Sequence, residues 1–165
     1  MAKGTEALNL LRALEKGGLR HLIVGGMAVV LYGIERATFD IDIAISPCVD
    51  DVKRLMDILK RLGYSKVIDP DTGKKIGELD EFEAEKVLEA ESVRVTDGQS
   101  VDILVVPSGT FDFMWEYHVE VSYKGAKILV PSILDLIHLK EQAGRPIDLE
   151  DARKLRHILR SKKRG

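Results

Sequence analysis

Apolar residues recur along the first third of the chain with two periods, which predict helices and strands. Leucines at helical spacing over residues 5–16 predict an amphipathic helix. The apolar run at 21–24 predicts a short buried strand ending at Gly25-Gly26, and residues 27–32 predict a buried helix after it. Residues 40–46 alternate acidic and aliphatic side chains, which is the period of a strand.

The rest of the chain predicts further helices together with antiparallel hairpins, and therefore an α+β fold with a mixed sheet flanked by helices. Asp50 or Asp51 is placed to cap an amphipathic helix that ends near Leu62. The remaining predicted elements are strands over 64–68 and 74–76, a helix over 79–90, a hairpin of 92–96 and 99–106 that turns at Asp97-Gly98, a short helix over 110–115, a hairpin of 119–123 and 126–130 that turns at Lys124-Gly125, a helix over 132–143 capped by Ser132, and a helix over 147–160.

Length and composition restrict the class of protein. The 165 residues, 45% hydrophobic and 32% charged, suit one globular domain, with a core over about 18–130 and a helical segment over 131–165. No apolar run approaches the ~20 residues that span a bilayer, and the first residues lack a signal-peptide core. The single cysteine, Cys48, fits a reducing compartment. These features predict a cytoplasmic protein without a membrane partner.

The net charge of −2 conceals an uneven distribution of charge. Residues 78–91 are strongly acidic, whereas the segment from Arg153 to Arg164 carries seven Lys and Arg side chains. A basic terminus of this kind is able to contact nucleic acid or another polyanion. A solvated helix face explains the same pattern, and the sequence leaves both interpretations open.

Three carboxylates stand inside apolar runs, where their charge is costly to desolvate without a compensating partner. Asp40 and Asp42 lie two residues apart on one predicted strand, so their side chains share a face. Asp102 has the same position among aliphatic residues of a later strand, and it completes the cluster if the two strands are neighbours. Three converging carboxylates repel one another unless a cation lies between them, and hard oxygen ligands suit Mg²⁺.

The Gly25-Gly26 turn favours phosphate chemistry beside these carboxylates. Glycines at the start of a helix offer free backbone N–H groups with no Cβ in the way of a phosphate. Each signal alone has a simpler explanation: a solvated edge strand for Asp40 and Asp42, a plain turn for the glycines, and a structural salt bridge for Asp102. Their conjunction predicts a site for a metal ion and a nucleotide.

This conjunction resembles the nucleotidyltransferase superfamily with the polymerase-beta-type catalytic core. The segment Val24-Gly25-Gly26-Met27-Ala28 and residues 33–43 look like the small stand-alone bacterial and archaeal members near the AbiEii-type abortive-infection toxins and the minimal nucleotidyltransferases. The runs 134–140 and 145–151 match the same group. The resemblance covers about residues 20–155, and it implies a nucleotidyltransferase-like mixed sheet followed by C-terminal helices.

The resemblance also implies roles for single residues. It implies that Asp40, Asp42 and Asp102 are catalytic and hold Mg²⁺, with two ions expected. It implies that Gly25 and Gly26 hold the phosphates of a nucleoside triphosphate.

Three further residues are assigned to nucleotide binding by the resemblance, each with an alternative. Lys140 either reaches a phosphate or occupies a solvated helix position. Arg36 either contacts the substrate or forms a salt bridge with a strand-end acid such as Asp40. Thr38 binds nucleotide or orients the local backbone.

Two other groups of side chains carry weaker signals. Arg145 pairs with Asp148, with Asp151 or with the substrate. The aromatic side chains within 113–117 are able to stack on a base, although core packing is the default interpretation.

One departure from the superfamily concerns the residue after the glycine pair. Many active members have Ser or Thr there, whose hydroxyl binds phosphate, whereas this chain has Met27. We expect Mg²⁺-dependent transfer of NMP from an NTP to a hydroxyl of RNA, a protein or a small molecule, with an antitoxin as partner if the chain is a toxin. The alternatives are an inactive module of the same fold that binds nucleotide, RNA or a protein, and a metal-dependent hydrolase.

Overall fold

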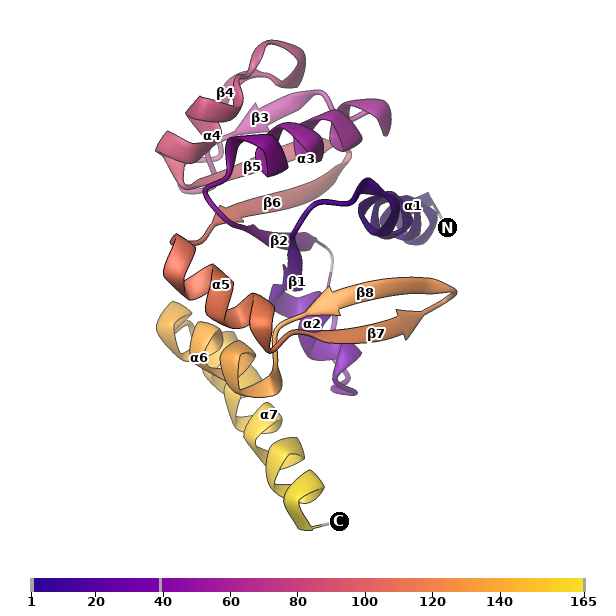
Figure 1. Ribbon diagram of the computed structural model, residues 1–165, viewed down its shortest axis with the longest axis vertical. Helices are drawn as coiled ribbons and strands as arrows, with labels where there is room; N and C mark the ends of the chain where they lie inside the picture. The colour runs from indigo at the N-terminus through magenta and orange to yellow at the C-terminus, as the bar shows by residue number, and fades with distance from the viewer. Residues whose placement is uncertain (1, 39, 165) are drawn as a thin grey trace.

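The protein is built around one mixed six-stranded sheet with helices on its faces and two helices at its C-terminus (Figure 1). The structure is a computed structural model that describes residues 2–38 and 40–164; Phe39, within the segment 33–43, lies outside the described residues. The elements are α1 (Ala2–Gly17), β1 (Leu22–Val24), α2 (Gly25–Leu31), β2 (Ile41–Ile45), α3 (Val49–Arg61), β3 (Lys66–Ile68), β4 (Lys75–Glu78), the 3₁₀ turn η1 (Leu79–Glu81), α4 (Ala84–Ala90), β5 (Ser92–Asp97), β6 (Gln99–Val105), α5 (Ser108–Glu116), β7 (Val119–Tyr123), β8 (Ala126–Val130), α6 (Ile133–Ala143) and α7 (Pro146–Arg164).

The sheet has the strand order β1-β2-β6-β5-β3-β4. The central pair β2 and β6 is parallel and every other pair is antiparallel. The strands β7 and β8 form a separate hairpin that contacts α1 and β1. This arrangement confirms the predicted α+β fold, with a mixed sheet, flanking helices and C-terminal helices.

The two faces of the sheet differ in what covers them. Ile41, Ile43 and Ile45 point into the main hydrophobic core, which includes side chains from α1, α3 and α7. Because neighbouring residues of a strand point to opposite faces, Asp42 and Ala44 lie on the other face. Ala44 packs there in a smaller cluster with α5, and α6 lies beside it. The carboxylate of Asp42 therefore faces the side of the sheet near the C-terminal helices.

Two local predictions were wrong. The segment 79–90 is not one helix, because Phe82 and Glu83 have extended backbone between η1 and α4, and the Phe82 side chain is buried. Asp50 and Asp51 do not cap α3; they lie in its first turn, where acidic side chains favour the positive end of the helix.

Other boundaries are as predicted or close to it. Ser132 caps α6, with its hydroxyl oxygen accepting a hydrogen bond from the Asp135 backbone N–H. The predicted helix over 27–32 starts at Gly25, directly at the end of β1. Within the described part of the chain, every helix is too short or too polar to cross a lipid bilayer.

Candidate functional site

Two of the three predicted carboxylates lie side by side on the sheet. Parallel pairing of β2 with β6 sets Asp42 directly opposite Asp102, so the two strands are neighbours as the predicted cluster required. Burial, followed by the adjacent negative charge and hydrogen bond of Asp102, raises the pKa of Asp42 to about 7. Burial is the largest cause of this raised pKa and the charge of Asp102 adds to it, so a cation bound beside the pair would lower the pKa of Asp42.

An arginine that no sequence motif indicated completes this row of charges. Arg94 on β5 pairs directly across from Asp102 on β6. Its Nε lies 2.7 Å from one carboxylate oxygen of Asp102, and a terminal nitrogen lies 3.2 Å from the other. Asp42, Asp102 and Arg94 therefore follow one another across three adjacent strands.

Asp40 is placed differently from the other two carboxylates. It is exposed and precedes β2, and its backbone carbonyl accepts a hydrogen bond from the Thr38 hydroxyl at 3.4 Å. In residues 2–38 and 40–164, no group of three His, Cys, Asp or Glu side chains gathers closely enough to hold a metal ion. The pair Asp42 and Asp102 nonetheless suits a divalent cation, because two adjacent oxygen donors with a shared excess of negative charge are present.

The glycine pair provides space for contacts that a side chain would block. A Cβ on Gly25, which has a positive φ of 67°, would lie 1.8 Å from a carboxylate oxygen of Asp42. A Cβ on Gly26 would lie 2.9 Å from the Thr38 hydroxyl and 3.3 Å from the guanidinium carbon of Arg36. The predicted nucleotide-binding residues Gly26, Arg36 and Thr38 are therefore brought together next to Gly25 and Asp42.

Two features of α2 modify the sequence interpretation of this turn. The helix has only seven residues, so its dipole would contribute little to the binding of a phosphate at the turn. Met27 is buried in the main core, so its side chain points away from the surface of the turn. The side-chain hydroxyl nearest Gly26 is instead that of Thr38.

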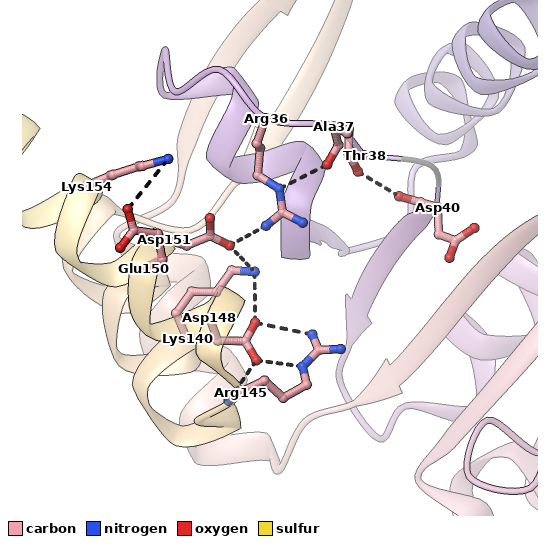
Figure 2. A network of polar contacts seen from close by, with 10 residues as sticks. All are labelled: Arg36, Ala37, Thr38, Asp40, Lys140, Arg145, Asp148, Glu150, Asp151 and Lys154. Atoms are coloured by element: carbon pink, nitrogen blue, oxygen red, sulfur yellow. Dashed lines mark hydrogen bonds and ion pairs between the residues drawn. The ribbon is translucent and has the colours of Figure 1, made fainter.

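An ion network joins the segment before β2 to the C-terminal helices (Figure 2); its carboxylates and Lys140 are buried, whereas Arg145 is exposed. Arg36 forms an ion pair with Asp151, which also lies 3.1 Å from the Lys140 ammonium nitrogen. Lys140 is 3.4 Å from Asp148, which receives two further hydrogen bonds from the side chain of Arg145. The network therefore contains three positively charged side chains and two carboxylates.

This network shows the protein partners of these three cations, and their contact with a substrate stays a prediction. Arg36 pairs with Asp151 and not with Asp40, and Arg145 pairs with Asp148. A solvated position for Lys140 is wrong, because its side chain is 7% exposed and held by two carboxylates.

The protonation of Asp148 reflects these contacts. Burial alone would raise the pKa of Asp148, but the hydrogen bonds and charges of Arg145 and Lys140 outweigh it and hold the pKa below its usual value. Asp148 is therefore an anion throughout the neutral range, and the cations around it keep their partner.

A cavity of about 170 Å³ lies between the sheet and α6, directly beside Asp42. Most of its lining is apolar, and it is bounded at one side by charged groups of the ion network. The lining includes Gly25, Asp42, Leu104, Leu139, Lys140 and Arg145.

The three aromatic residues that were candidates for stacking on a base lie in α5 or directly after it, away from this cavity. Phe113 and Tyr117 are 56% and 54% exposed and contact each other, so core packing was the wrong expectation for both. Trp115 is partly buried against the smaller cluster, as expected. None of the three lines the cavity beside Asp42.

Comparison with solved structures identifies the fold. The lincosamide antibiotic adenylyltransferase LnuA, with lincomycin bound, superposes with a TM-score of 0.64 at 17% identity, over 93% of this chain and 96% of that one. ANT(2″)-Ia in complex with adenylyl-2″-tobramycin gives 0.61 at 16% identity, over 99% and 92%. An antigenic nucleotidyltransferase-like protein from Paracoccidioides brasiliensis gives 0.54 at 15% identity, over 93% and 74%.

Similarity at this level of identity concerns the fold alone. The chain has the architecture of nucleotidyltransferases along almost its whole length. No protein-family model and no curated protein sequence matches it.

Proposed function

We propose that this protein is a nucleotidyltransferase that moves NMP from an NTP to a hydroxyl group of an acceptor. One observation carries the proposal: Asp42 lies beside Gly25 and in register with Asp102, while Arg36 and Thr38 lie beside Gly26. Lys140 of α6 shares the carboxylate of Asp151 with Arg36. The nucleotidyltransferase fold, which is that of the adenylyltransferases LnuA and ANT(2″)-Ia, supports it.

The electrostatics of the site suit a triphosphate. The network of Arg36, Lys140 and Arg145 has one positive charge more than Asp148 and Asp151 neutralise, and a polyphosphate would add the missing negative charge. Gly26 leaves room for a phosphate to approach the backbone, and the Thr38 hydroxyl is a further donor there. We assign these residues to the phosphates.

The carboxylates would hold Mg²⁺ and receive the proton. Asp42 and Asp102, with Asp40 before β2, are the residues that would bind the ion, which when bound offsets the charge of the phosphate oxygens. The acceptor hydroxyl attacks the α-phosphorus, the bond from that phosphorus to the bridging oxygen breaks, and pyrophosphate leaves. The proton of the hydroxyl passes to a carboxylate of the Asp42–Asp102 pair.

Product analysis tests this reaction against its nearest rival. The protein is incubated with Mg²⁺, α-labelled NTPs and, in turn, RNA, a protein mixture and small hydroxyl compounds. Transfer places the label on one acceptor and releases pyrophosphate, and Asp42→Asn abolishes both. Release of free nucleotide with every acceptor would identify a metal-dependent hydrolase instead.

A second candidate is an inactive module that retains nucleotide binding. It is favoured by Met27, whose position lacks the usual hydroxyl and whose side chain lies in the core. Binding of NTP without turnover, with every acceptor tested, would select this candidate. RNA or a protein partner would then be the ligand to seek.

A toxin role rests on the resemblance to the AbiEii-type group. If the protein is a toxin, its expression slows growth, Asp42→Asn removes the effect, and an antitoxin partner is expected. Harmless expression of an active enzyme would exclude this role.

A further inference from the structure

The contacts of Asp102 bear on how many metal ions the site accepts. Asp42, Asp102 and Arg94 occupy equivalent positions on β2, β6 and β5, so the negative, negative and positive groups form one row across the sheet. Asp102 lies in the middle of this row. It shares its excess charge with Asp42 on one side and is bound by the guanidinium on the other.

Arg94 binds Asp102 in the geometry that gives the strongest ion pairs. Both carboxylate oxygens accept a hydrogen bond from it, at 2.7 Å and 3.2 Å. Bidentate, charge-assisted bonds of this type are about twice as strong as neutral ones, and an arginine keeps its charge at every accessible pH. The Asp102 side chain is 19% exposed, so water competes little for it.

Before a nucleotide binds, the charges of the side chains in this row and of Asp40 balance with a single divalent cation. Asp40, Asp42 and Asp102 bring three negative charges, and Arg94 neutralises one of them. The remaining two match one divalent ion. The other cations near Asp42, namely Lys140 and Arg145, pair with Asp148 and Asp151, and the one excess positive charge of their network is assigned to the phosphates.

We infer that Arg94 takes the place of a second divalent cation, so that the site of this protein holds one metal ion beside Asp42 and Asp102. The inference rests on the proposed function, because it concerns the metal that this function uses. It replaces the expectation of two ions. Arg94 thereby becomes a positioning residue for Asp102 and a fixed positive charge at the site.

Counting bound Mn²⁺ tests the inference without measuring activity. Free Mn²⁺ has a sharp electron paramagnetic resonance signal that broadens on binding, so a titration gives the number of ions bound per chain. The protein is titrated with one equivalent of the α,β-methylene analogue of each common NTP. We expect one nucleotide-dependent Mn²⁺ per chain for the wild type.

Three variants separate charge, geometry and general effects. Arg94→Met removes the positive charge, so we expect a second Mn²⁺ to bind with at least about ten-fold higher affinity than in the wild type, since a charge within a few Å shifts such equilibria by about 1–3 logarithmic units. Arg94→Lys keeps the charge and should keep one ion. Arg153→Met is the matched control, because Arg153 forms an equally bidentate but exposed pair with Glu150; it should also keep one ion.

The outcomes separate the inference from the proposed function. Two Mn²⁺ per chain in the wild type overturn the inference while the proposed function stands. One Mn²⁺ in both the wild type and Arg94→Met would show that Arg94 does not set the number of bound ions, and this result also overturns the inference. No nucleotide-dependent Mn²⁺ in the wild type overturns both. Circular dichroism melts identify any variant that does not fold. In that case the number of Mn²⁺ ions bound per wild-type chain decides the test.

Discussion

The position of Gly25 shows how closely single residues determine the site. Its backbone has a positive φ, and the carboxylate of Asp42 lies where a Cβ would be. A glycine is therefore needed here for two separate reasons, the left-handed backbone and the contact with a candidate catalytic group. Gly18 has nearly the same φ of 69°, but a Cβ on it would have nothing within 4 Å, so it has only the first reason.

This difference gives a matched pair of variants. Gly18→Ala and Gly25→Ala should each lower the free energy of unfolding by about 1–2 kcal/mol, because both force alanine into the left-handed region. Only Gly25→Ala also displaces Asp42, so only it should weaken Mg²⁺-dependent NTP binding. Urea unfolding and calorimetry measure the two effects. Equal NTP affinity in both variants would contradict the contact between Gly25 and the site.

At the level of elements, the sequence was sufficient for the strands but not for their register. The pattern of aliphatic residues located β2 and β6, and hence Asp42 and Asp102. A two-residue turn at Asp97-Gly98 would have set Arg94 opposite Val101, with Asp102 on the other face. The hairpin instead pairs Asp97 with Gln99, which brings Arg94 opposite Asp102. The conformation of the turn sets this register, and the hydrophobic periodicity of the two strands does not predict it.

The ion network on α6 and α7 should matter for stability as well as for binding. Asp148→Asn leaves Arg145 without its carboxylate and Lys140 with Asp151 as its one remaining carboxylate, so it should lower the free energy of unfolding by about 3 kcal/mol. Glu150→Gln, on the same helix, changes only the exposed pairs with Arg153 and Lys154 and should leave the urea midpoint unchanged. If both variants unfold at the same urea concentration, Asp148 does not have this structural role.

Across the whole molecule, the site is assembled from segments far apart in the sequence. Asp42 belongs to β2 and Asp102 to β6. Lys140 belongs to α6, and Asp151 on α7 holds Arg36 from the segment before β2 (Figure 2). The sequence named most of these residues through motifs. It named Asp148 and Asp151 as partners of Arg145 but did not show that these acids of α7 would also hold Lys140 and Arg36, because a pattern of 3.6 residues per turn defines a buried face without identifying what lies against it.

The folded protein should also lose stability in mild acid through a residue remote from these ions. Burial lowers the pKa of His21 below its usual 6.5, despite opposing contributions from the Leu19 carbonyl and Asp51. A lowered histidine pKa means that the unfolded chain binds the proton first. Stability from this residue is therefore complete above about pH 6.5 and declines as the pH falls toward the folded pKa.

Comparison with His21→Asn isolates this effect. Between about pH 6.5 and pH 5, the wild type should lose up to about 1.4 kcal/mol per pH unit relative to His21→Asn. The exposed His157 provides the control, since His157→Asn should follow the wild type. Urea unfolding at several pH values gives both curves. Parallel curves for the wild type and His21→Asn would show that His21 does not carry this dependence.

The proposed function depends above all on a metal-dependent nucleotide site at Asp42. Calorimetric titration with each common NTP, with and without Mg²⁺, is the decisive experiment, beside Asp42→Asn and the control Asp112→Asn, whose pair with Arg20 is exposed. We expect Mg²⁺-dependent binding of at least one NTP by the wild type and the control, and its loss in Asp42→Asn. Binding of equal strength in Asp42→Asn, or no binding by the wild type, would contradict the assignment of the site.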